Sequence, residues 1–226
     1  MPFKSLKRFK NSLSSKYRAK RFVSDSITAY YDRLAEKLSD DARAAGWQSS
    51  RTQNLRFLSL SLIADLSEST ILDVGCGVGD LYAFLKTEFH GFQYHGIDLS
   101  QKMIERAQEK HPEASFSADN LFAFSEKKAS SYDYVLASGA FSYKVPKPMH
   151  YLRECIVEMQ KLSKKGIAFN LLSEQAPSEL KVQSRFHYYN PVEVLALCLE
   201  FTPYVELKHH YLQNDFTVFL HFSLDS

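Results

Sequence analysis

The sequence has little of what marks disulfide-stabilised, zinc-binding or membrane-spanning proteins. Its 226 residues include only three cysteines, Cys76, Cys155 and Cys198. They are odd in number and widely spaced, which fits neither a disulfide framework nor a zinc site. No apolar run approaches the length that crosses a bilayer, and the N-terminal stretch lacks the apolar core of a signal peptide. These absences predict a reduced, cytoplasmic protein without a membrane span.

Net charge is also small. The 28 basic residues are nearly balanced by 26 acidic ones, and a formal charge of +2 does not by itself indicate nucleic-acid binding. The balance fails in residues 1–22, which contain many lysines and arginines but no acidic residue. Such an arm could contact RNA, an anionic membrane surface or an acidic partner. The interpretation that we favour is a solvated, flexible leader.

The rest of the chain has a globular composition and a regular alternation of patterns. Hydrophobic residues make up 45% of the chain and charged residues 24%, which is enough for a buried core. Apolar residues at helical spacing predict two helices, within 27–38 and 55–66. Beyond them, short apolar runs predict strands and amphipathic segments predict helices. The strands are expected over 71–74, 94–98, 114–118, 132–138 and 166–172, and the helices over 80–89, 100–111, 149–159 and 190–200.

The last two apolar runs, 204–211 and 215–222, are separated only by "LQN". Three residues permit a hairpin but not a parallel crossover. The fold class is therefore α/β, with a mostly parallel sheet, helices on both faces and an antiparallel pair at the end. We expect residues 1–22 to be the arm and 23–226 to be a single domain, with N-terminal helices in 23–68 and the α/β core in 69–226.

The loop "GCGVG", residues 75–79, follows the first predicted strand, at the end of the sheet where such folds bind ligands. Glycines there can serve only a tight turn. A dinucleotide site would need G-x-G-x-x-G and no acid facing the phosphates. Here the spacing is G-x-G-x-G and Asp80 follows directly. A cationic ligand without phosphates, such as S-adenosylmethionine, tolerates these acids better.

Two acids at later strand ends extend the pattern. Asp98 ends the second predicted strand, where a carboxylate can accept both hydrogens of a ribose diol. Asp119 follows the third strand and can accept an adenine amino group, with Asn120 beside it. Asp119 alone is more simply a helix-capping acid in a loop. Its place after Asp98 favours a nucleoside ligand.

Residues 71–222 resemble the class I S-adenosylmethionine-dependent methyltransferases. The stretches "ILDVGCGVGD", "GIDLSQKMIERA", "FSADN" and "YDYVLASGAF" resemble four motifs of that family in order, and the flanks "AAGWQSSRTQNLRF" and "FHYYNPVEVLALCLEFTP" resemble a bacterial subgroup of unspecified substrate. The resemblance implies a Rossmann-like, seven-stranded, mostly parallel sheet with a reversed last strand and an N-terminal helical cap. It implies S-adenosylmethionine as cofactor and S-adenosylhomocysteine (SAH) as product. The implied cofactor positions are Asp73, Gly75, Cys76, Gly77, Asp98, Leu99, Met103, Asp119, Asn120, Ser138 and Gly139.

In this fold the acceptor pocket lies among the N-terminal helices and the loops after the fourth and fifth strands. Candidate residues there are Tyr30, Trp47, Arg56, Phe141, Tyr143, His187 and Tyr188. Their aromatic character favours a small or medium-sized, aromatic or apolar acceptor, although each also has an interpretation as a packing or surface residue. Arg56 either holds a carboxylate of the cofactor or substrate, or extends along the surface. Methyl transfer needs mainly alignment, so no catalytic residue is identified, and His187 or Tyr143 could act as a base.

No metal site is predicted, because His209 and His210 are adjacent on a strand, point to opposite faces and lack a third ligand. Three functions remain open. The favoured one is a methyltransferase acting on a small molecule. The alternatives are a non-catalytic S-adenosylmethionine-binding partner or sensor, and an RNA methyltransferase that uses the basic arm.

Overall fold

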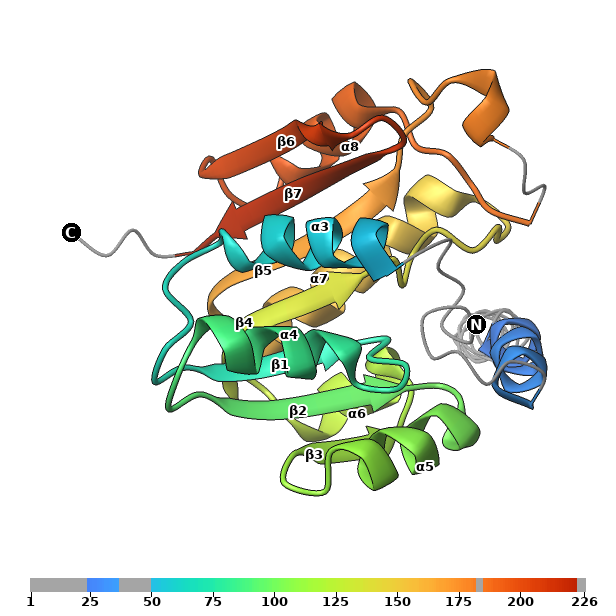
Figure 1. Cartoon of the computed structure of the whole chain (residues 1–226). Helices are drawn as coiled ribbons and strands as arrows, with labels where there is room; N and C mark the ends of the chain where they lie inside the picture. The colour runs from blue at the N-terminus through green and yellow to red at the C-terminus, as the bar shows by residue number, and fades with distance from the viewer. Residues whose placement is uncertain (1–23, 37–49, 182–184, 223–226) are drawn as a thin grey trace, which may run out of the picture.

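The computed structural model describes residues 24–36, 50–181 and 185–222. The predicted basic arm and Trp47 lie outside the described residues. A seven-stranded sheet runs through the centre in the order β3-β2-β1-β4-β5-β7-β6 (Figure 1). Its strands are β1 Thr70–Val74, β2 Gln93–Asp98, β3 Ser115–Ala118, β4 Tyr132–Ser138, β5 Ser163–Leu172, β6 Val205–Leu212 and β7 Asp215–His221.

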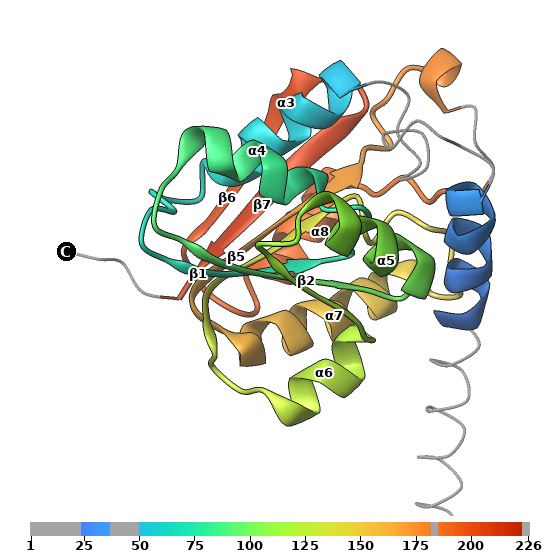
Figure 2. The ribbon, with the colours of Figure 1, turned by 60° about the horizontal axis from the view of Figure 1, so that its bottom comes forward.

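Helices cover both faces of this sheet (Figure 2). On one face lie α3 Ser50–Ser61, α4 Asp80–Glu88 and α5 Gln101–Lys110, and on the other α6 Leu121–Lys127, α7 Pro148–Leu162 and α8 Pro191–Cys198. Alternate residues of each strand enter different cores. In β1, Leu72 packs with the α6–α8 cluster and Ile71 with the α3–α5 cluster. Burial on both faces explains why the central strands read as continuous apolar runs.

The reversed strand predicted from "LQN" is confirmed. β7 pairs antiparallel with both β5 and β6, while the other neighbouring strands pair in parallel. In the β5–β7 register Asp215 lies opposite Leu172. The reversal therefore brings the first residue of β7 to the carboxyl end of β5, where the loops of the parallel strands gather.

Two predicted helix caps are confirmed. The Ser100 side chain accepts a hydrogen bond from the Met103 amide, and Asn190 caps α8. The sequence reasoning did not predict α6, a seven-residue helix capped by Asn120, because it is too short to carry a periodic pattern. The fifth strand also begins at Ser163, earlier than predicted.

The helix α3 was expected from its leucine spacing, but its buried face differs from that stripe. Leu58 is 46% exposed and Leu62 is 55% exposed. α3 instead buries Arg56 and Ser59, and the Ser59 hydroxyl donates to Thr217 Oγ1 of β7 at 2.8 Å. Phe57 and Leu60 are buried on the same helix, so the inward face of α3 combines apolar packing with polar contacts to β7.

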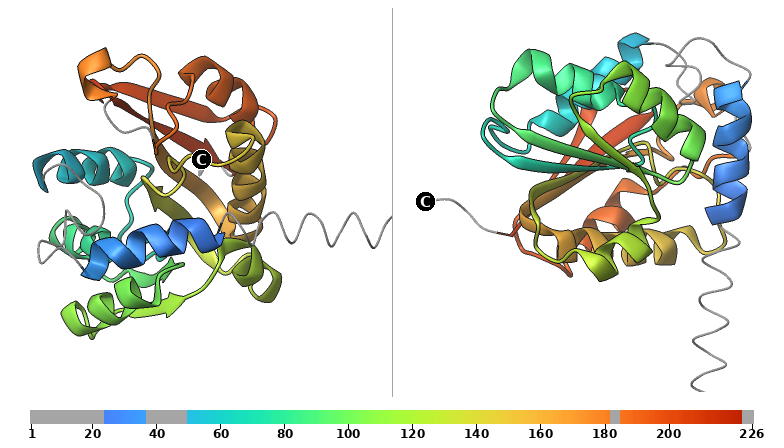
Figure 3. Two further views of the ribbon diagram at one scale, coloured as in Figure 1. Left: turned by 90° about the vertical axis from the view of Figure 1, so that its right-hand side faces the viewer. Right: turned by 90° about the horizontal axis from the view of Figure 1, so that it is seen from below.

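A further helix, residues 24–36, crosses the edge of the sheet at which the parallel strands end (Figure 3). The Asn120 amide donates to Ser24 Oγ at 2.7 Å, and Arg106 Nη1 donates to the Ala35 carbonyl at 3.2 Å. These contacts hold the helix against the loops after β2 and β3, as a helical cap requires. None of the helices in the described part of the chain is long and apolar enough to cross a membrane.

Candidate functional site

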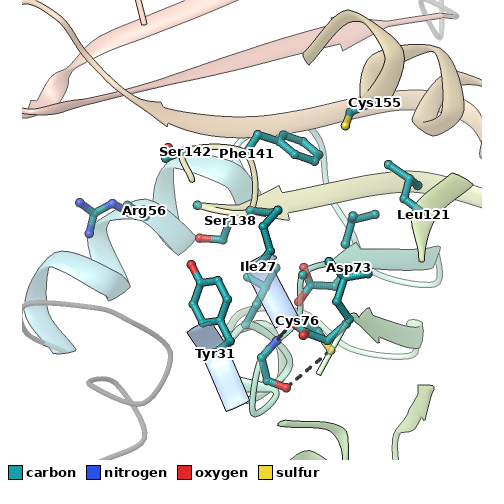
Figure 4. Close-up of a pocket in the computed structure, with 18 of the residues that line it drawn as sticks. Ile27, Tyr31, Arg56, Asp73, Cys76, Leu121, Ser138, Phe141, Ser142 and Cys155 are labelled. Carbon is teal, nitrogen blue, oxygen red and sulfur yellow. Dashed lines mark hydrogen bonds between the residues drawn. The ribbon is translucent and has the colours of Figure 1, made fainter. Parts of the chain in front are cut away.

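A cavity of about 170 Å³ opens where the parallel strands end, beneath the helix 24–36 (Figure 4). Its lining comes from that helix, from α3 and from the loops after the strands, including the turn before β7. All eleven positions that the resemblance implied for a cofactor line this one cavity: Asp73, Gly75, Cys76, Gly77, Asp98, Leu99, Met103, Asp119, Asn120, Ser138 and Gly139.

The glycine loop after β1 packs closely against the loop after β4. Gly75 has a φ of +76°, a conformation that residues with a side chain rarely adopt. A Cβ added to Gly75 would lie 2.8 Å from Cβ of Ala140. The Gly75 amide donates to the Ile97 carbonyl at 2.8 Å, which ties the loop to the end of β2. Glycine is therefore needed here both for its backbone conformation and for the close approach of the two loops.

Asp73, in β1, is a buried carboxylate at the floor of the cavity. It is 1% exposed, and its Oδ2 accepts a hydrogen bond from the Tyr94 hydroxyl at 2.6 Å. Burial raises the pKa of Asp73 to about 7, against the opposing effect of the Tyr94 hydrogen bond. Its other oxygen, Oδ1, has no hydrogen-bond partner among the described residues. A cationic or hydrogen-donating ligand group would satisfy this oxygen.

Asp98 joins the ends of β1 and β2. Its Oδ2 accepts the Gly77 amide at 3.0 Å and its Oδ1 accepts the Ser100 amide at 2.8 Å. Burial raises the pKa of Asp98, and these backbone hydrogen bonds oppose the rise. A carboxylate has about four lone-pair sites, so both oxygens can still accept from a ribose diol.

Asp119 and Asn120 stand at the end of β3. Asp119 Oδ1 accepts the Asn120 amide at 2.9 Å, and Lys127 Nζ lies 3.5 Å from Oδ2. Asn120 uses its side-chain oxygen to cap α6 and its nitrogen to hold Ser24. One residue therefore connects the loop after β3 to the helix 24–36.

These residues fit S-adenosylmethionine, the cofactor that the resemblance implied. The Ser138 hydroxyl, like Asp73 Oδ1, is buried with no hydrogen-bond partner among the described residues. The acidic side chains at the ends of β1, β2 and β3 suit a cationic nucleoside and would repel the phosphates of a dinucleotide. The close approach of the Gly75 loop leaves backbone, without a side chain, facing the ligand.

The predicted acceptor residues divide into two groups. Arg56, Phe141 and Tyr188 line the cavity. The other described candidates, Tyr30, Tyr143 and His187, are not in its lining, and all seven assignments to the acceptor pocket stay predictions.

Each of the three outside the lining has another contact. The rings of Tyr30 and Tyr143 pack 5.6 Å apart. His187 packs on Tyr189 with ring centroids 4.4 Å apart, and burial lowers its pKa. It lines a second pocket near the starts of α7 and α8, and Tyr188 lines both cavities.

Arg56 has a partner that the sequence analysis did not foresee. Its Nε donates to Asp215 Oδ1 at 2.7 Å and its Nη2 to Asp215 Oδ2 at 2.5 Å. Both side chains line the cavity and are almost fully buried, at 5% and 2% exposure. A paired, side-on geometry of this kind is the strongest form of ion pair in proteins.

Several other lining residues were not predicted, because the four motifs do not include them and the flanking stretches resemble a subgroup of unspecified substrate, which assigns them no role. From the covering helix and α3 come Ile27, Gln53 and Phe57, and from the C-terminal half come Leu172, Leu180, Phe186, Asn214 and Asp215. For Asp215 a signal existed. It begins a reversed strand, and that reversal places its first residue at the ligand-binding edge.

The adjacent histidines have separate environments. His209 Nε2 lies 2.8 Å from the Ser173 hydroxyl, and His210 is exposed. Within the described ranges, no three histidine, cysteine or acidic side chains gather as a metal site.

Comparison with known proteins gives a consistent result. Residues 72–166 match the model of a methyltransferase domain. A protein of Mycobacterium tuberculosis named as a methyltransferase is 27% identical over 154 residues, which cover 66% of this chain and 90% of the relative. The malonyl-[acyl-carrier protein] O-methyltransferase of Brevibacillus brevis is 28% identical over 130 residues, covering 55% of this chain and 46% of that protein.

Among solved structures, the plantazolicin methyltransferase in complex with SAH superposes with a TM-score of 0.62 at 18% identity. The match covers 89% of this chain and 98% of that protein. At this level of identity the likeness concerns the fold, which is the seven-stranded arrangement described above.

Proposed function

The chain belongs to the class I S-adenosylmethionine-dependent methyltransferases, and on that premise we propose that its cavity binds S-adenosylmethionine and directs the methyl group to a small or medium-sized acceptor. One observation carries the cofactor assignment. Eleven positions chosen from sequence motifs, at the ends of four different strands, line a single cavity.

Different residues would contact different parts of the cofactor. Asp73 and the backbone at Gly75 and Gly77 would hold the methionine part, where the buried unsatisfied Asp73 Oδ1 offers an acceptor for its ammonium. Asp98 would hold the ribose hydroxyls. Asp119 and Asn120 would hold the adenine, beside the apolar side chains of their neighbours in the cavity wall.

When bound, S-adenosylmethionine would supply a sulfonium methyl group for transfer to an acceptor lone pair, with SAH as the leaving group and loss of the acceptor's proton. The chain's own residues align the reactants and exclude water. Ile27 and Tyr31 of the helix 24–36 line the cavity (Figure 4). Burial raises the pKa of Tyr31 above its ordinary value, so this phenol stays protonated.

A small acceptor is more compatible with this cavity than RNA. Phe141, Phe186 and Tyr188 supply aromatic wall beyond the cofactor positions. Acids at four points of the lining, Asp73, Asp80, Asp98 and Asp119, would repel a phosphate backbone. Removal of residues 1–22 should therefore leave methylation of a small molecule unchanged and insensitive to salt.

We also place the protein in a reducing compartment such as the cytoplasm. Cys76, Cys155 and Cys198 are all buried and none forms a disulfide. Burial raises the pKa of the Cys76 and Cys198 thiols, which keeps them protonated and unreactive.

Calorimetric titration of the purified protein with S-adenosylmethionine, SAH and NAD⁺ tests the cofactor assignment. We expect saturable binding of the first two and none of NAD⁺. Absence of binding to both S-adenosylmethionine and SAH would refute the proposal. Incubation with methyl-labelled cofactor and fractionated cell extract then tests catalysis, and binding without any labelled product would favour the sensor alternative.

A further inference from the structure

We propose that the acceptor presents a hydroxyl or an amine on an apolar body, and that the paired Arg56 and Asp215 exclude carboxylate and phosphate acceptors. The inference rests on the proposed function, because it concerns what occupies the cavity beside the cofactor. It follows from the charges of the lining, from the geometry of one ion pair and from the apolar part of the lining.

The described lining of the cavity is rich in acids and poor in bases. Its acidic members are Asp73, Asp80, Asp98, Asp119 and Asp215. Arg56 is the one basic side chain among the described lining residues, which include no lysine or histidine. Among the described lining residues, an anionic acceptor would thus have only Arg56 as its counter-charge.

Arg56 already has a counter-ion. Two hydrogen bonds from its guanidinium reach the two carboxylate oxygens of Asp215, and both side chains are buried. The position of Asp215 is set by the β5–β7 ladder, in which it pairs with Leu172. The ladder therefore holds the backbone of Asp215 beside α3, and the pair presents a dipole, not a net positive charge.

The lysines near the lining are also committed to acids. Lys110 Nζ lies 2.7 Å from Asp80 Oδ1, and Lys127 Nζ lies 3.5 Å from Asp119 Oδ2. Gln53 donates to the other oxygen of Asp80 at 2.9 Å. These contacts offset two of the acids, and within the described ranges they leave no lysine in the cavity lining.

Apolar and aromatic side chains make up much of the cavity lining that does not belong to the predicted cofactor positions. Phe57, Leu172, Leu180 and Phe186 line the cavity together with Tyr188, whose hydroxyl donates to the Leu180 carbonyl at 3.2 Å. A carboxylate entering this region would lose water without gaining a cation, which is costly. A hydroxyl or neutral amine loses less on burial and can donate to carboxylate or amide oxygens in the lining.

The chemical class of the product tests the inference in the unaltered protein. Methyl-labelled S-adenosylmethionine is incubated with the protein and the small-molecule fraction of a bacterial extract, and the labelled product is treated with mild alkali. A carboxyl methyl ester releases volatile methanol, whereas a methyl ether or methylamine retains the label. We expect the label to be retained. Release as methanol, with SAH binding intact, would overturn this inference alone, whereas absence of SAH binding would count against the proposed function.

Fragment binding to the SAH-saturated protein gives a second, independent readout. Benzyl alcohol, benzylamine, benzoate and phenyl phosphate share a ring and differ in charge, and ligand-observed NMR compares their affinities. We expect both anions to bind at least about ten-fold more weakly than benzyl alcohol, because about 1.4 kcal/mol of unfavourable desolvation has that effect. Equal binding of benzoate and benzyl alcohol would contradict the proposal.

The substitution Asp215→Asn isolates the ion pair. It removes the charge that compensates Arg56 and keeps the side-chain shape, so benzoate affinity should rise about ten-fold or more while benzyl alcohol affinity stays unchanged. Glu158→Gln, on α7 and outside the described lining, is the matched control and should change neither. SAH binding reports whether the variant is folded. Unchanged benzoate affinity in a folded Asp215→Asn protein would overturn the proposal that the ion pair excludes anionic acceptors. If the variant does not fold, the comparison of benzoate with benzyl alcohol in the wild-type protein still tests that proposal.

Discussion

Arg56 and Asp215 are 159 positions apart in the sequence, yet the guanidinium of one holds both carboxylate oxygens of the other, at 2.7 and 2.5 Å. The pair fastens α3 to the reversed strand β7. On the same side, Ser59 of α3 bonds Thr217, two residues further along β7. Of these four residues, Arg56 and Asp215 both fasten α3 to β7 and line the cavity.

Breaking this pair should destabilise the protein strongly. Arg56→Ala or Asp215→Ala should lower the free energy of unfolding by about 3 to 5 kcal/mol, because each leaves an uncompensated buried charge. The double variant Arg56→Met, Asp215→Leu should recover most of the loss. Chemical denaturation measures each value. As control, Arg153→Ala breaks an exposed pair with Glu200 and should cost no more than about 1 kcal/mol. Similar losses of unfolding free energy on breaking the buried and the exposed pair would show that burial does not cause the large effect.

Removal of the Asp98 carboxylate should weaken cofactor binding. Asp98→Ala is expected to raise the SAH dissociation constant about ten- to a hundredfold, since hydrogen bonds to a charged acceptor contribute about 1.5 to 3 kcal/mol. Calorimetric titration gives the value. Glu109→Ala, on the exposed side of the neighbouring α5, should leave SAH binding within experimental error. An Asp98→Ala protein that binds SAH like the wild type would remove Asp98 from the site.

Alanine substitutions at two glycines with the same backbone requirement can distinguish an effect on stability from an effect on SAH binding. Gly75 and Gly91 have φ values of +76° and +68°. Alanine at either position should cost about 1 to 3 kcal/mol through backbone strain.

In Gly75→Ala the new methyl also meets Ala140 at the cavity, whereas in Gly91→Ala it meets the carboxylate of Glu68, the far end of a flexible side chain. The midpoint temperature of thermal unfolding should therefore fall in both variants, whereas the affinity for SAH should fall only in Gly75→Ala. Equal affinities in the two would mean that the Gly75 loop does not contact the ligand.

The raised pKa of Asp73 predicts a pH dependence of stability. Its folded pKa of about 7 exceeds the ordinary 3.8, so between these values the folded state holds a proton that the unfolded state has lost. The contribution of Asp73 therefore favours folding at low pH and declines as pH rises toward 7.

Asp73→Asn removes this dependence. Between pH 5 and pH 7 the cofactor-free variant should gain about 2 kcal/mol of unfolding free energy relative to the wild type. Denaturation at several pH values measures the difference, in which the titrations shared by both proteins cancel. A difference that is constant with pH would mean that Asp73 is ionised throughout the range.

Much of the fold could be predicted from the sequence because its signals are local. The run Ile71–Val74 is apolar on both faces and so reads as a central strand, and Ser100 and Asn190 cap their helices through residues two or three positions away. The acids Asp73 and Asp98 lie in strands that run in parallel, so the parallel arrangement alone brings them to one edge. The strands and the hairpin followed from such patterns, whereas the cofactor positions at that edge are those that the family resemblance implied.

Only the tertiary structure decided what depends on partners distant in the chain. The exposure of Leu58 and the burial of Arg56 depend on where β7 lies, since its Thr217 and Asp215 offer α3 polar contacts that helical periodicity does not encode. The pKa of Asp73 depends on desolvation and on Tyr94 of the neighbouring strand. Sequence therefore determined which strand ends and loops line the cavity, through local backbone geometry. Folding determined the charge balance of the acceptor side, because an ion pair acquires its strength and its specificity only when both partners are buried together.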